Sequence, residues 1–176
     1  ILALTQTFEK FVPREFLNRI AKDGFEHIRL GNTHTDVITM LFSDIRAFTS
    51  LSETMTPRQL MTFLNNYLQL MNEPIRANQG FVDKFVGDAI MALYDHPQGT
   101  DEGEAIGALR SAIGMQRNLT LYNRMRLHAG YSPISAGIGI HSGEVIIGTI
   151  GSENRMDSTV LGDAVNLASR LESLTK

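Results

Sequence analysis

The sequence FVDKFVGDAIMALY at residues 81–94 decides the fold. It consists of two apolar stretches joined by Gly87 and Asp88, a pair that predicts the tight turn of a β-hairpin. A second apolar run, VITMLFS at residues 37–43, ends at Asp44 and predicts a core strand. If this strand lies beside the hairpin, the carboxylates of Asp44 and Asp88 lie close together.

These two carboxylates are candidates for a metal site. At a separation of about 4 Å they repel each other by about 4 kcal/mol at an effective dielectric near 20, so a positive group usually offsets them. Oxygen ligands without His or Cys suit a hard cation such as Mg²⁺ or Mn²⁺, with phosphates completing its shell. Alternatively, Asp88 only forms the turn and Asp44 only caps the next helix, since Asp serves well in both roles.

The composition is that of one ordinary globular domain. The 176 residues are 43% hydrophobic and 20% charged, and there is no Cys, which excludes disulfides, thiolate metal sites and Cys nucleophiles. A net charge of −3 gives no general attraction to nucleic acid, so contact with a polyphosphate must be local. Because no apolar run is long enough to span a membrane and no signal peptide is visible, we expect a cytoplasmic domain. Membrane attachment of a longer protein stays open.

Residues 1–24 predict a helix, and residues 25–36 predict a polar connection. The helix either continues from a preceding domain or simply packs on the core. We therefore assign residues 1–30 to an N-terminal helical connector and residues 31–176 to the main domain. Because the chain begins at Ile1 and stops at Lys176 within an apparent helix, we expect a fragment of a longer protein.

Two long helices are expected to cover the sheet. The first begins at Thr56-Pro57, an N-cap followed by a first-turn proline, and its apolar face is formed by Leu60, Phe63, Leu64, Tyr67, Leu68, Met71 and Ile75. The second extends from Asp101 to about His128, and its inward residues are expected to be Ala105, Ile106, Leu109, Ile113, Met115 and Leu119.

The C-terminal part predicts further strands and a last helix. We expect strands at residues 134–140, 144–150 and 157–161, with a turn at 141–143 and a polar loop at 152–156. The last helix spans residues 164–174, with Leu167, Leu171 and Leu174 expected on its buried face. Asn166 and Arg170 share the other face and suit an anionic group, although a merely solvated face is the alternative.

The predicted order of elements is strand, helix, helix, strand, strand, helix, strand, strand, helix. This order indicates an α+β fold with a ferredoxin-like, or palm-like, β-α-β-β-α-β core. Its sheet is antiparallel, with helices packed on one face.

Four segments of the sequence resemble the catalytic domain of class III nucleotide cyclases, adenylyl and guanylyl. They are LFSDIRAFT at 41–49, DKFVGDAIM at 83–91, GIHSG at 139–143 and LGDAVNLASRLE at 161–172. Domains of this family continue past the last helix into further strands bearing a Lys that contacts the triphosphate. The resemblance therefore implies that residues 31–176 are C-terminally incomplete.

The resemblance implies that Asp44 and Asp88, with the backbone carbonyl of Ile45, hold two Mg²⁺ or Mn²⁺ ions. The helix start at Phe48 and Thr49 offers backbone N–H groups to the phosphates of the nucleotide. In-line attack of the ribose 3′-oxygen on the α-phosphorus then forms a cyclic nucleotide and releases pyrophosphate.

The remaining implied roles concern the ribose and the base. Asn166 would orient the ribose, and Arg170 would stabilise charge on the α-phosphoryl group. Lys84 and Thr159 match the positions that select the base, where adenylyl cyclases typically carry Lys with Asp or Thr, and guanylyl cyclases carry Glu at the first position. We therefore expect an adenylyl cyclase that acts on ATP. A guanylyl cyclase and a catalytically silent dimerisation or nucleotide-sensing module are the alternatives.

In this family the active site forms between two subunits. One chain would contribute Asp44 and Asp88, and the other the four residues that contact base, ribose and α-phosphate. Because a single sequence holds both sets, the resemblance implies a symmetric homodimer with two sites. The N-terminal helix would connect this dimer to an upstream sensor or regulatory domain. One departure from the family is Ala47, where most members have Gly.

Overall fold

A computed structural model describes residues 30–31, 33–152 and 155–175. The helix expected within residues 1–24 lies outside these residues. The order of elements in the described part matches the prediction, except that the strands expected at residues 134–140 and 144–150 form a single strand. The elements are β1 (Thr33–Ile45), α3 (Phe48–Glu53), α4 (Pro57–Ala77), β2 (Phe81–Val86), β3 (Ala89–Tyr94), α5 (Asp101–His128), β4 (Ala136–Ser152), β5 (Arg155–Leu161) and α6 (Asp163–Ser173).

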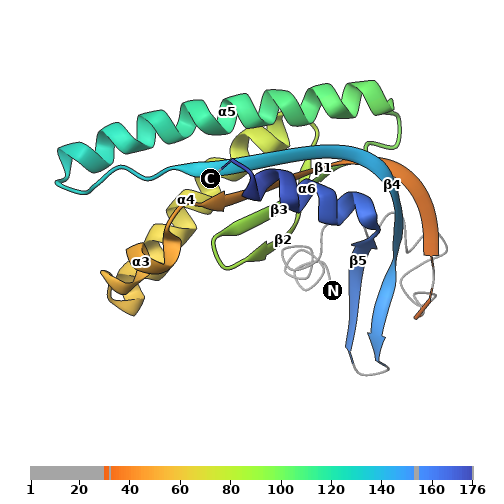
Figure 1. Ribbon diagram of the computed structural model, residues 1–176, viewed down its shortest axis with the longest axis horizontal. Coiled ribbons are helices and arrows are strands. Elements are labelled where there is room, and N and C mark those ends of the chain that lie inside the picture. The colour runs from red at the N-terminus through yellow and green to blue at the C-terminus, as the bar shows by residue number, and fades with distance from the viewer. Residues whose placement is uncertain (1–29, 32, 153–154, 176) are drawn as a thin grey trace, which may run out of the picture.

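The five strands form one antiparallel sheet in the order β2-β3-β1-β4-β5. The long strands β1 and β4 curve strongly, so that β5 lies outside the plane of the other strands (Figure 1). Residues 136–145 of β4 pair with β1 only, because β5 pairs with residues 146–152. The other edge of residues 136–145 has no strand partner among the described residues. The expected antiparallel α+β fold is confirmed, and the expected strands beyond α6 stay a prediction.

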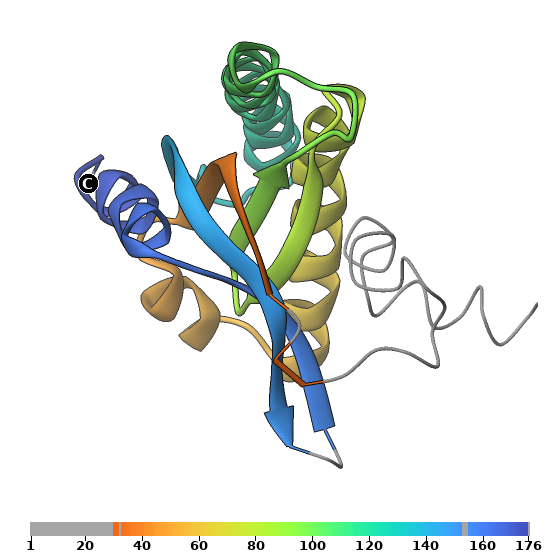
Figure 2. The same ribbon diagram turned by 90° about the vertical axis from the view of Figure 1, so that its right-hand side faces the viewer.

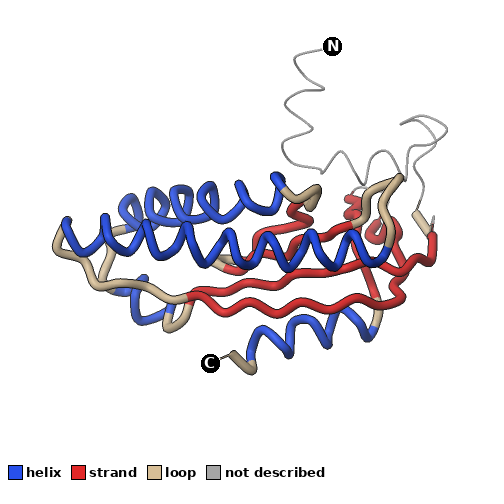
Figure 3. Tube along the Cα trace, turned by 90° about the horizontal axis from the view of Figure 1, so that it is seen from above, coloured by secondary structure: helices blue, strands red, loops and turns tan. Residues whose placement is uncertain are grey.

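The helices cover both faces of the sheet, not one face as expected. Helices α4 and α5 pack on one face, and α6 packs on the opposite face (Figures 2 and 3). Alternation along β1 supplies both cores: Leu41 and Ile45 belong to the core under α4 and α5, whereas Ile38 and Met40 belong to the core under α6. Both faces of the central strand are therefore buried, which explains its continuous apolar sequence.

Helix α4 begins where the sequence predicts. The Thr56 side chain accepts a hydrogen bond from the Gln59 backbone N–H, the Gln59 side chain accepts one from the Thr56 backbone N–H, and Pro57 occupies the first turn. The predicted apolar face is confirmed by the buried residues Phe63, Tyr67, Met71 and Ile75.

The predicted inward face of α5 is largely wrong. Met115 and Leu119 are buried as expected, but Ile106, Leu109 and Ile113 are exposed. The buried face is formed mainly by small residues, namely Gly107, Ala108 and Ser111. Small residues are needed because α5 approaches α4 closely: a Cβ at position 107 would lie 2.8 Å from the Asn78 carbonyl oxygen, and the Ser111 hydroxyl donates to the Pro74 carbonyl at 3.0 Å. Close backbone packing here overrides hydrophobic periodicity.

Strand β4 is one continuous strand, so the turn predicted at residues 141–143 is wrong. Gly143, within the expected turn, and Gly139, within the strand expected before it, leave room for α6. A Cβ at Gly139 would lie 2.2 Å from the Glu172 backbone nitrogen, and one at Gly143 would lie 2.8 Å from the Ala164 Cβ. The residues 33–36, expected in a polar connection, extend β1 because this longer β4 pairs with them.

The buried face of α6 also differs from the expectation. Ala164, Ala168 and Glu172 are buried, whereas Leu167 and Leu174 are exposed. Alanines fit because the helix lies directly on the glycine-containing strand. Asn166 and Arg170 are exposed on α6, as predicted from their spacing.

Candidate active site

The structure places Asp44 and Asp88 side by side. Ser43 pairs with Ile90 across β1 and β3, so the end of β1 lies next to the hairpin turn. Gly87 adopts a left-handed conformation with φ of 64°, which the tight turn requires. The backbone N–H of Ile45 donates to Asp88 Oδ2 at 3.0 Å, and only 9% of Asp88 is exposed. The hairpin therefore delivers one carboxylate directly beside the other.

The environment of this pair disfavours two negative charges. Burial, together with the hydrogen bond and the negative charge of Asp44, raises the pKa of Asp88 from 3.8 to about 7. Neither carboxylate forms a salt bridge with the residues that the structure describes. Two crowded carboxylates without a counter-charge fit a divalent hard cation.

A metal ion at this pair would need additional ligands. Within the described parts of the chain, no three His, Cys, Asp or Glu side chains group in a way that could hold a metal ion. Backbone carbonyl groups, water or a bound phosphate would therefore complete the coordination. This donor set suits Mg²⁺ or Mn²⁺, but the roles of Asp44, Asp88 and Ile45 as ligands stay predictions.

Tyr67 of α4 lies near this pair. Burial, and to a smaller extent the charges of Asp88 and Asp44, raise the pKa of its phenol from 10.0 to about 12. The hydroxyl group therefore stays protonated at neutral pH.

The loop after Asp44 leads into the short helix α3. Ala47 is the N-cap of α3 and has a left-handed conformation, with φ of 54° and ψ of 33°. The backbone N–H groups of Phe48 and Thr49 lie in the first helical turn, where no helical carbonyl precedes them. The Phe48 side chain packs against the core under α4 and α5, and Thr49 is exposed. Their contact with phosphate stays a prediction.

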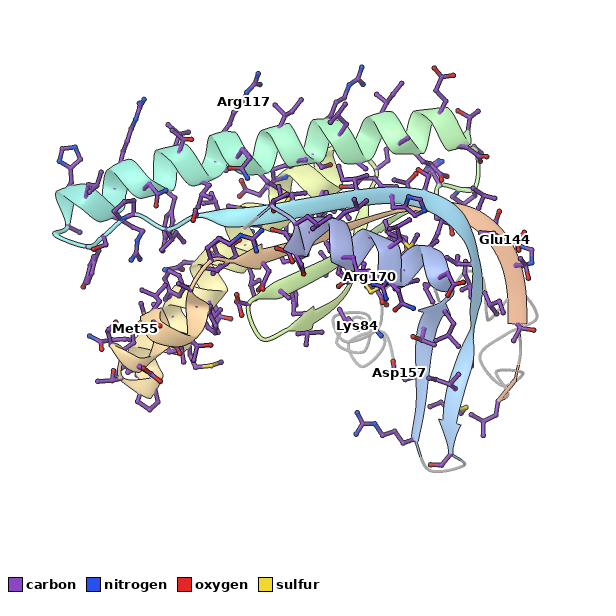
Figure 4. The ribbon with its side chains drawn as sticks, viewed as in Figure 1. Met55, Lys84, Arg117, Glu144, Asp157 and Arg170 are labelled. Atoms are coloured by element: carbon purple, nitrogen blue, oxygen red, sulfur yellow. The ribbon has the colours of Figure 1, made fainter. Side chains whose placement is uncertain are left out.

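The other predicted site residues come from β2, β5 and α6. Lys84 lies on β2, Asp157 on β5 and Arg170 on α6 (Figure 4), and the charge of Asp157 acts on Asp83, the neighbour of Lys84. Thr159 is 9% exposed and pairs with Gly148. Helix α3, which follows Asp44, lies at the opposite end of the sheet from β5 (Figure 1). No hydrogen bond or salt bridge between described residues joins the two carboxylates to this second group.

Asp83, which lies against Lys84, is a residue of this region that was not predicted from the sequence. The Asp83 side chain is 2% exposed, and its Oδ2 lies 3.5 Å from Lys84 Nζ. Burial raises the pKa of Asp83 from 3.8 to about 6, with Lys84 opposing the shift and Asp157 adding to it. A register shift between Val82 and Lys84 interrupts the pairing of β2 at this residue. An Asp inside an apolar strand was the clue, because Asp is unfavourable there.

A second missed interaction connects the Asp44 loop to α6. Arg46 Nη1 donates to Glu172 Oε1 at 2.6 Å, and Nη2 donates to the Glu172 carbonyl at 2.9 Å and to the Thr175 hydroxyl. Glu172 is 6% exposed, so this ion pair is largely withdrawn from water. Gly137 makes room for the guanidinium, because a Cβ there would overlap with it.

An antiparallel sheet that carries two crowded carboxylates, covered by a helix with an exposed amide and guanidinium, has the groups that an enzyme needs to act on nucleotide phosphates with divalent ions. Comparison with known proteins gives the family. The family described as adenylate and guanylate cyclase catalytic domain matches residues 30–176. This chain belongs to that family, whose catalytic domains use divalent metal ions.

Individual relatives agree with this assignment. An adenylate cyclase from Anabaena cylindrica is 48% identical over 174 residues, which cover 97% of this chain and 34% of that protein. The structure of the adenylyl cyclase CyaB from P. aeruginosa superposes with a TM-score of 0.74 and 38% identity, covering 81% of this chain and 74% of that chain. The guanylyl cyclase Cya2 has the same identity, a TM-score of 0.73, and coverage of 80% and 71%. The chain thus spans about a third of the length of the Anabaena relative.

In the described residues, no helix is both long enough and apolar enough to cross a membrane.

Proposed function

We propose that this domain is an adenylyl cyclase that converts ATP into 3′,5′-cyclic AMP and pyrophosphate at two equivalent sites between two copies of the chain. The observation that carries this proposal is the crowded pair of Asp44 and Asp88, which lacks a positive partner among the described residues. Burial, together with the neighbouring Asp44, raises the pKa of Asp88 to about 7. A site built for divalent cations and a polyphosphate explains why such a repulsive arrangement is retained.

Asp44, Asp88 and the carbonyl of Ile45 would hold two Mg²⁺ or Mn²⁺ ions. When bound, the ions lower the pKa of the ribose 3′-hydroxyl and neutralise charge on the triphosphate. The N–H groups at Phe48 and Thr49 point at the phosphates from the first turn of α3.

The groups on α6 act on the reacting part of the nucleotide. Asn166 orients the ribose so that its 3′-oxygen is in line with the α-phosphorus, and Arg170 donates to the α-phosphoryl oxygens as charge develops on them. Both side chains are exposed in one chain, and they share one face of the helix. A second subunit that brings Asp44 and Asp88 against this face completes the site.

The choice of ATP rests on Lys84 and Thr159. Lys84 donates to a ring nitrogen of adenine, and Thr159 accepts from the 6-amino group. Guanine presents O6 and N1–H, which call for the reverse pattern of donor and acceptor. Overall sequence identity does not distinguish ATP from GTP as the substrate, since an adenylyl and a guanylyl cyclase of known structure have the same identity to this chain. A guanylyl cyclase is therefore the second candidate.

The first test is turnover of ATP and GTP with Mn²⁺ at several protein concentrations. We expect cyclic AMP, with a rate that rises faster than linearly with protein concentration because the dimer must assemble. Cyclic GMP as the main product would overturn the assignment of Lys84 and Thr159. If no product forms from this domain with its natural flanking sequence, the domain is the silent module.

A mixing experiment tests the shared site. The variants Asp44→Ala and Arg170→Ala are each expected to be inactive, because each lacks one half of both sites. Mixed in equal amounts, they form one intact site in each heterodimer, so about a quarter of the wild-type activity returns. If the mixture stays inactive while both variants dimerise, the site does not form between subunits.

A further inference from the structure

A cavity separate from the proposed active site lies on the α4 and α5 side of the molecule. It has a volume of about 880 Å³, is open to solvent, and is lined by the α3–α4 link, the first half of α4, the end of α5 and the loop before β4. Met55 marks the α3–α4 corner of this cavity (Figure 4). Its size is that of pockets that hold small organic ligands. Asp44, Asp88 and the residues on α6 do not line it, so the proposed cyclase site leaves it without a role.

Arg126 is the unusual residue of this cavity, which we call the Arg126 pocket. Its side chain lines the cavity although the residue is only 7% exposed. The guanidinium carbon lies 5.3 Å from the ring centre of Phe63, 5.9 Å from that of Tyr122 and 5.5 Å from that of Tyr131. The side chain is thus held in place by three aromatic rings.

The charge of Arg126 has no anionic partner in the described part of the chain. Its Nε donates to the Ser132 carbonyl at 2.9 Å, whereas Nη1 and Nη2 donate to no described residue. Buried cations in proteins are nearly always paired with an anion, because an unpaired charge loses its hydration without compensation. The aromatic rings compensate part of this loss through their π-faces, but they do not satisfy the N–H groups at the end of the side chain.

We propose that the Arg126 pocket binds a small organic oxyanion, a carboxylate or phosphate that carries an apolar group. A planar guanidinium with two unused nitrogens donates to such an oxyanion in a bidentate manner. Leu51, Met55 and Met125 supply apolar surface for the body of the ligand, and Arg58 supplies a second positive charge among the lining residues. This proposal does not depend on the proposed cyclase activity.

Two probes of the same shape test the ligand class: benzoate and phenyl phosphate, with inorganic phosphate for comparison. Binding is measured by calorimetry on the purified chain, without nucleotide or metal. We expect the two aromatic anions to bind, and inorganic phosphate to bind at least tenfold more weakly because it lacks an apolar body. Failure of both aromatic anions to bind would overturn the proposal. Equal binding of inorganic phosphate would overturn the apolar part of it.

Variants test the location. Arg126→Met removes the charge but keeps an unbranched side chain, and Thr62→Trp fills the pocket while leaving Arg126 in place. Both are expected to weaken benzoate binding at least tenfold. Arg124→Met, an exposed arginine on the same helix, is the matched control and should bind as the wild type does. If Arg124→Met weakens binding as much as Thr62→Trp, the anion binds to the surface of α5 and the proposal is wrong.

Discussion

At the α3 end of the sheet, Asp44 and Asp88 are crowded, and Asp88 is largely buried with a pKa of about 7. At the α6 helix, by contrast, Asn166 and Arg170 are exposed to solvent. The first region carries an internal electrostatic cost that a bound cation or protonation of Asp88 relieves, whereas the second carries none. The difference indicates that the carboxylate region lowers the stability of the fold but provides a metal site. In the α6 region, function depends on the correct position of the helix. The following predictions test this contrast.

Asp44→Asn should separate function from stability. Losing a proposed metal ligand should reduce cyclase turnover by on the order of 10³-fold. Removing one of two repelling carboxylates should at the same time stabilise the fold by about 1 kcal/mol. Turnover and thermal unfolding without metal measure the two effects.

Arg170→Ala is the control for this prediction. Its turnover should fall by on the order of 10²–10³-fold, while its stability should stay within about 0.5 kcal/mol of the wild type, because the side chain is exposed. A lower melting temperature for Asp44→Asn than for the wild type would contradict the proposed repulsion.

Gly139→Ala should displace α6 without changing any proposed site residue. The new Cβ would meet the Glu172 backbone nitrogen at 2.2 Å and the Ala168 carbonyl oxygen at 2.5 Å, so α6 must move away from β4. We expect a loss of about 3 kcal/mol in the free energy of unfolding, measured with urea. Glu144→Ala on the same strand is exposed and should change it by less than about 0.5 kcal/mol. Equal stability of the two variants would show that α6 is not held against the strand.

The stability of the metal-free protein should fall as pH rises from about 4 to about 7. The folded-state pKa of Asp88 lies above its ordinary value of 3.8. In this pH range the folded state therefore binds more protons than the unfolded state, and raising the pH favours unfolding. Asp83 and Glu104, with pKa values raised to about 6 and about 7, act in the same direction.

The contribution of Asp88 is isolated by comparison. Melting temperatures between pH 4 and pH 8 should fall less steeply in Asp44→Asn than in the wild type, and less steeply with Mn²⁺ than with a chelator. Identical slopes in all three cases would rule out the carboxylate pair as the source.

Ala47→Gly should give the smallest effect, a gain of about 0.5–1 kcal/mol. Ala47 has a φ of 54°, which costs an alanine about 1–2 kcal/mol, and glycine adopts this conformation freely. Part of the gain is lost because glycine has more freedom in the unfolded chain. Chemical denaturation measures the difference, and a destabilised variant would argue against the left-handed conformation at the start of α3.

Large side chains made the fold predictable from sequence. The hairpin at residues 81–94, the strand before Asp44 and the apolar face of α4 could all be predicted, because their apolar residues follow one clear period. The proximity of Asp44 and Asp88 followed from the same hairpin.

Small residues explain the errors. Gly143 was placed in a turn and Gly139 in a separate short strand, yet both leave room for α6 against one continuous β4. Gly107 and Ser111 form the buried side of α5, although hydrophobicity favoured Ile106 and Leu109. Close approach of two backbones is a tertiary property, and it leaves no periodic hydrophobic pattern in the sequence.

Arg46, Glu172 and Asp83 were not predicted from the sequence for a similar reason. The pairing of Arg46 with Glu172 spans 126 positions of the chain, and neither residue stands out locally. Asp83 is affected by the charge of Asp157, although β2 and β5 lie at opposite edges of the sheet and far apart in the sequence. Both interactions arise only once the strands are bent and paired.

The direct contact of α6 with the backbone of β4 also has a mechanical consequence. At Gly139 and Gly143 no side chain of the strand lies between β4 and α6, so little can repack there and the helix moves with the strand. The Arg46–Glu172 ion pair connects the Asp44 loop to the same unit. In the proposed dimer, each subunit would then move as one unit that contributes half of each site. A small rotation of one subunit against the other would open or close the two sites together. A regulatory input therefore needs to change only the angle between the two subunits.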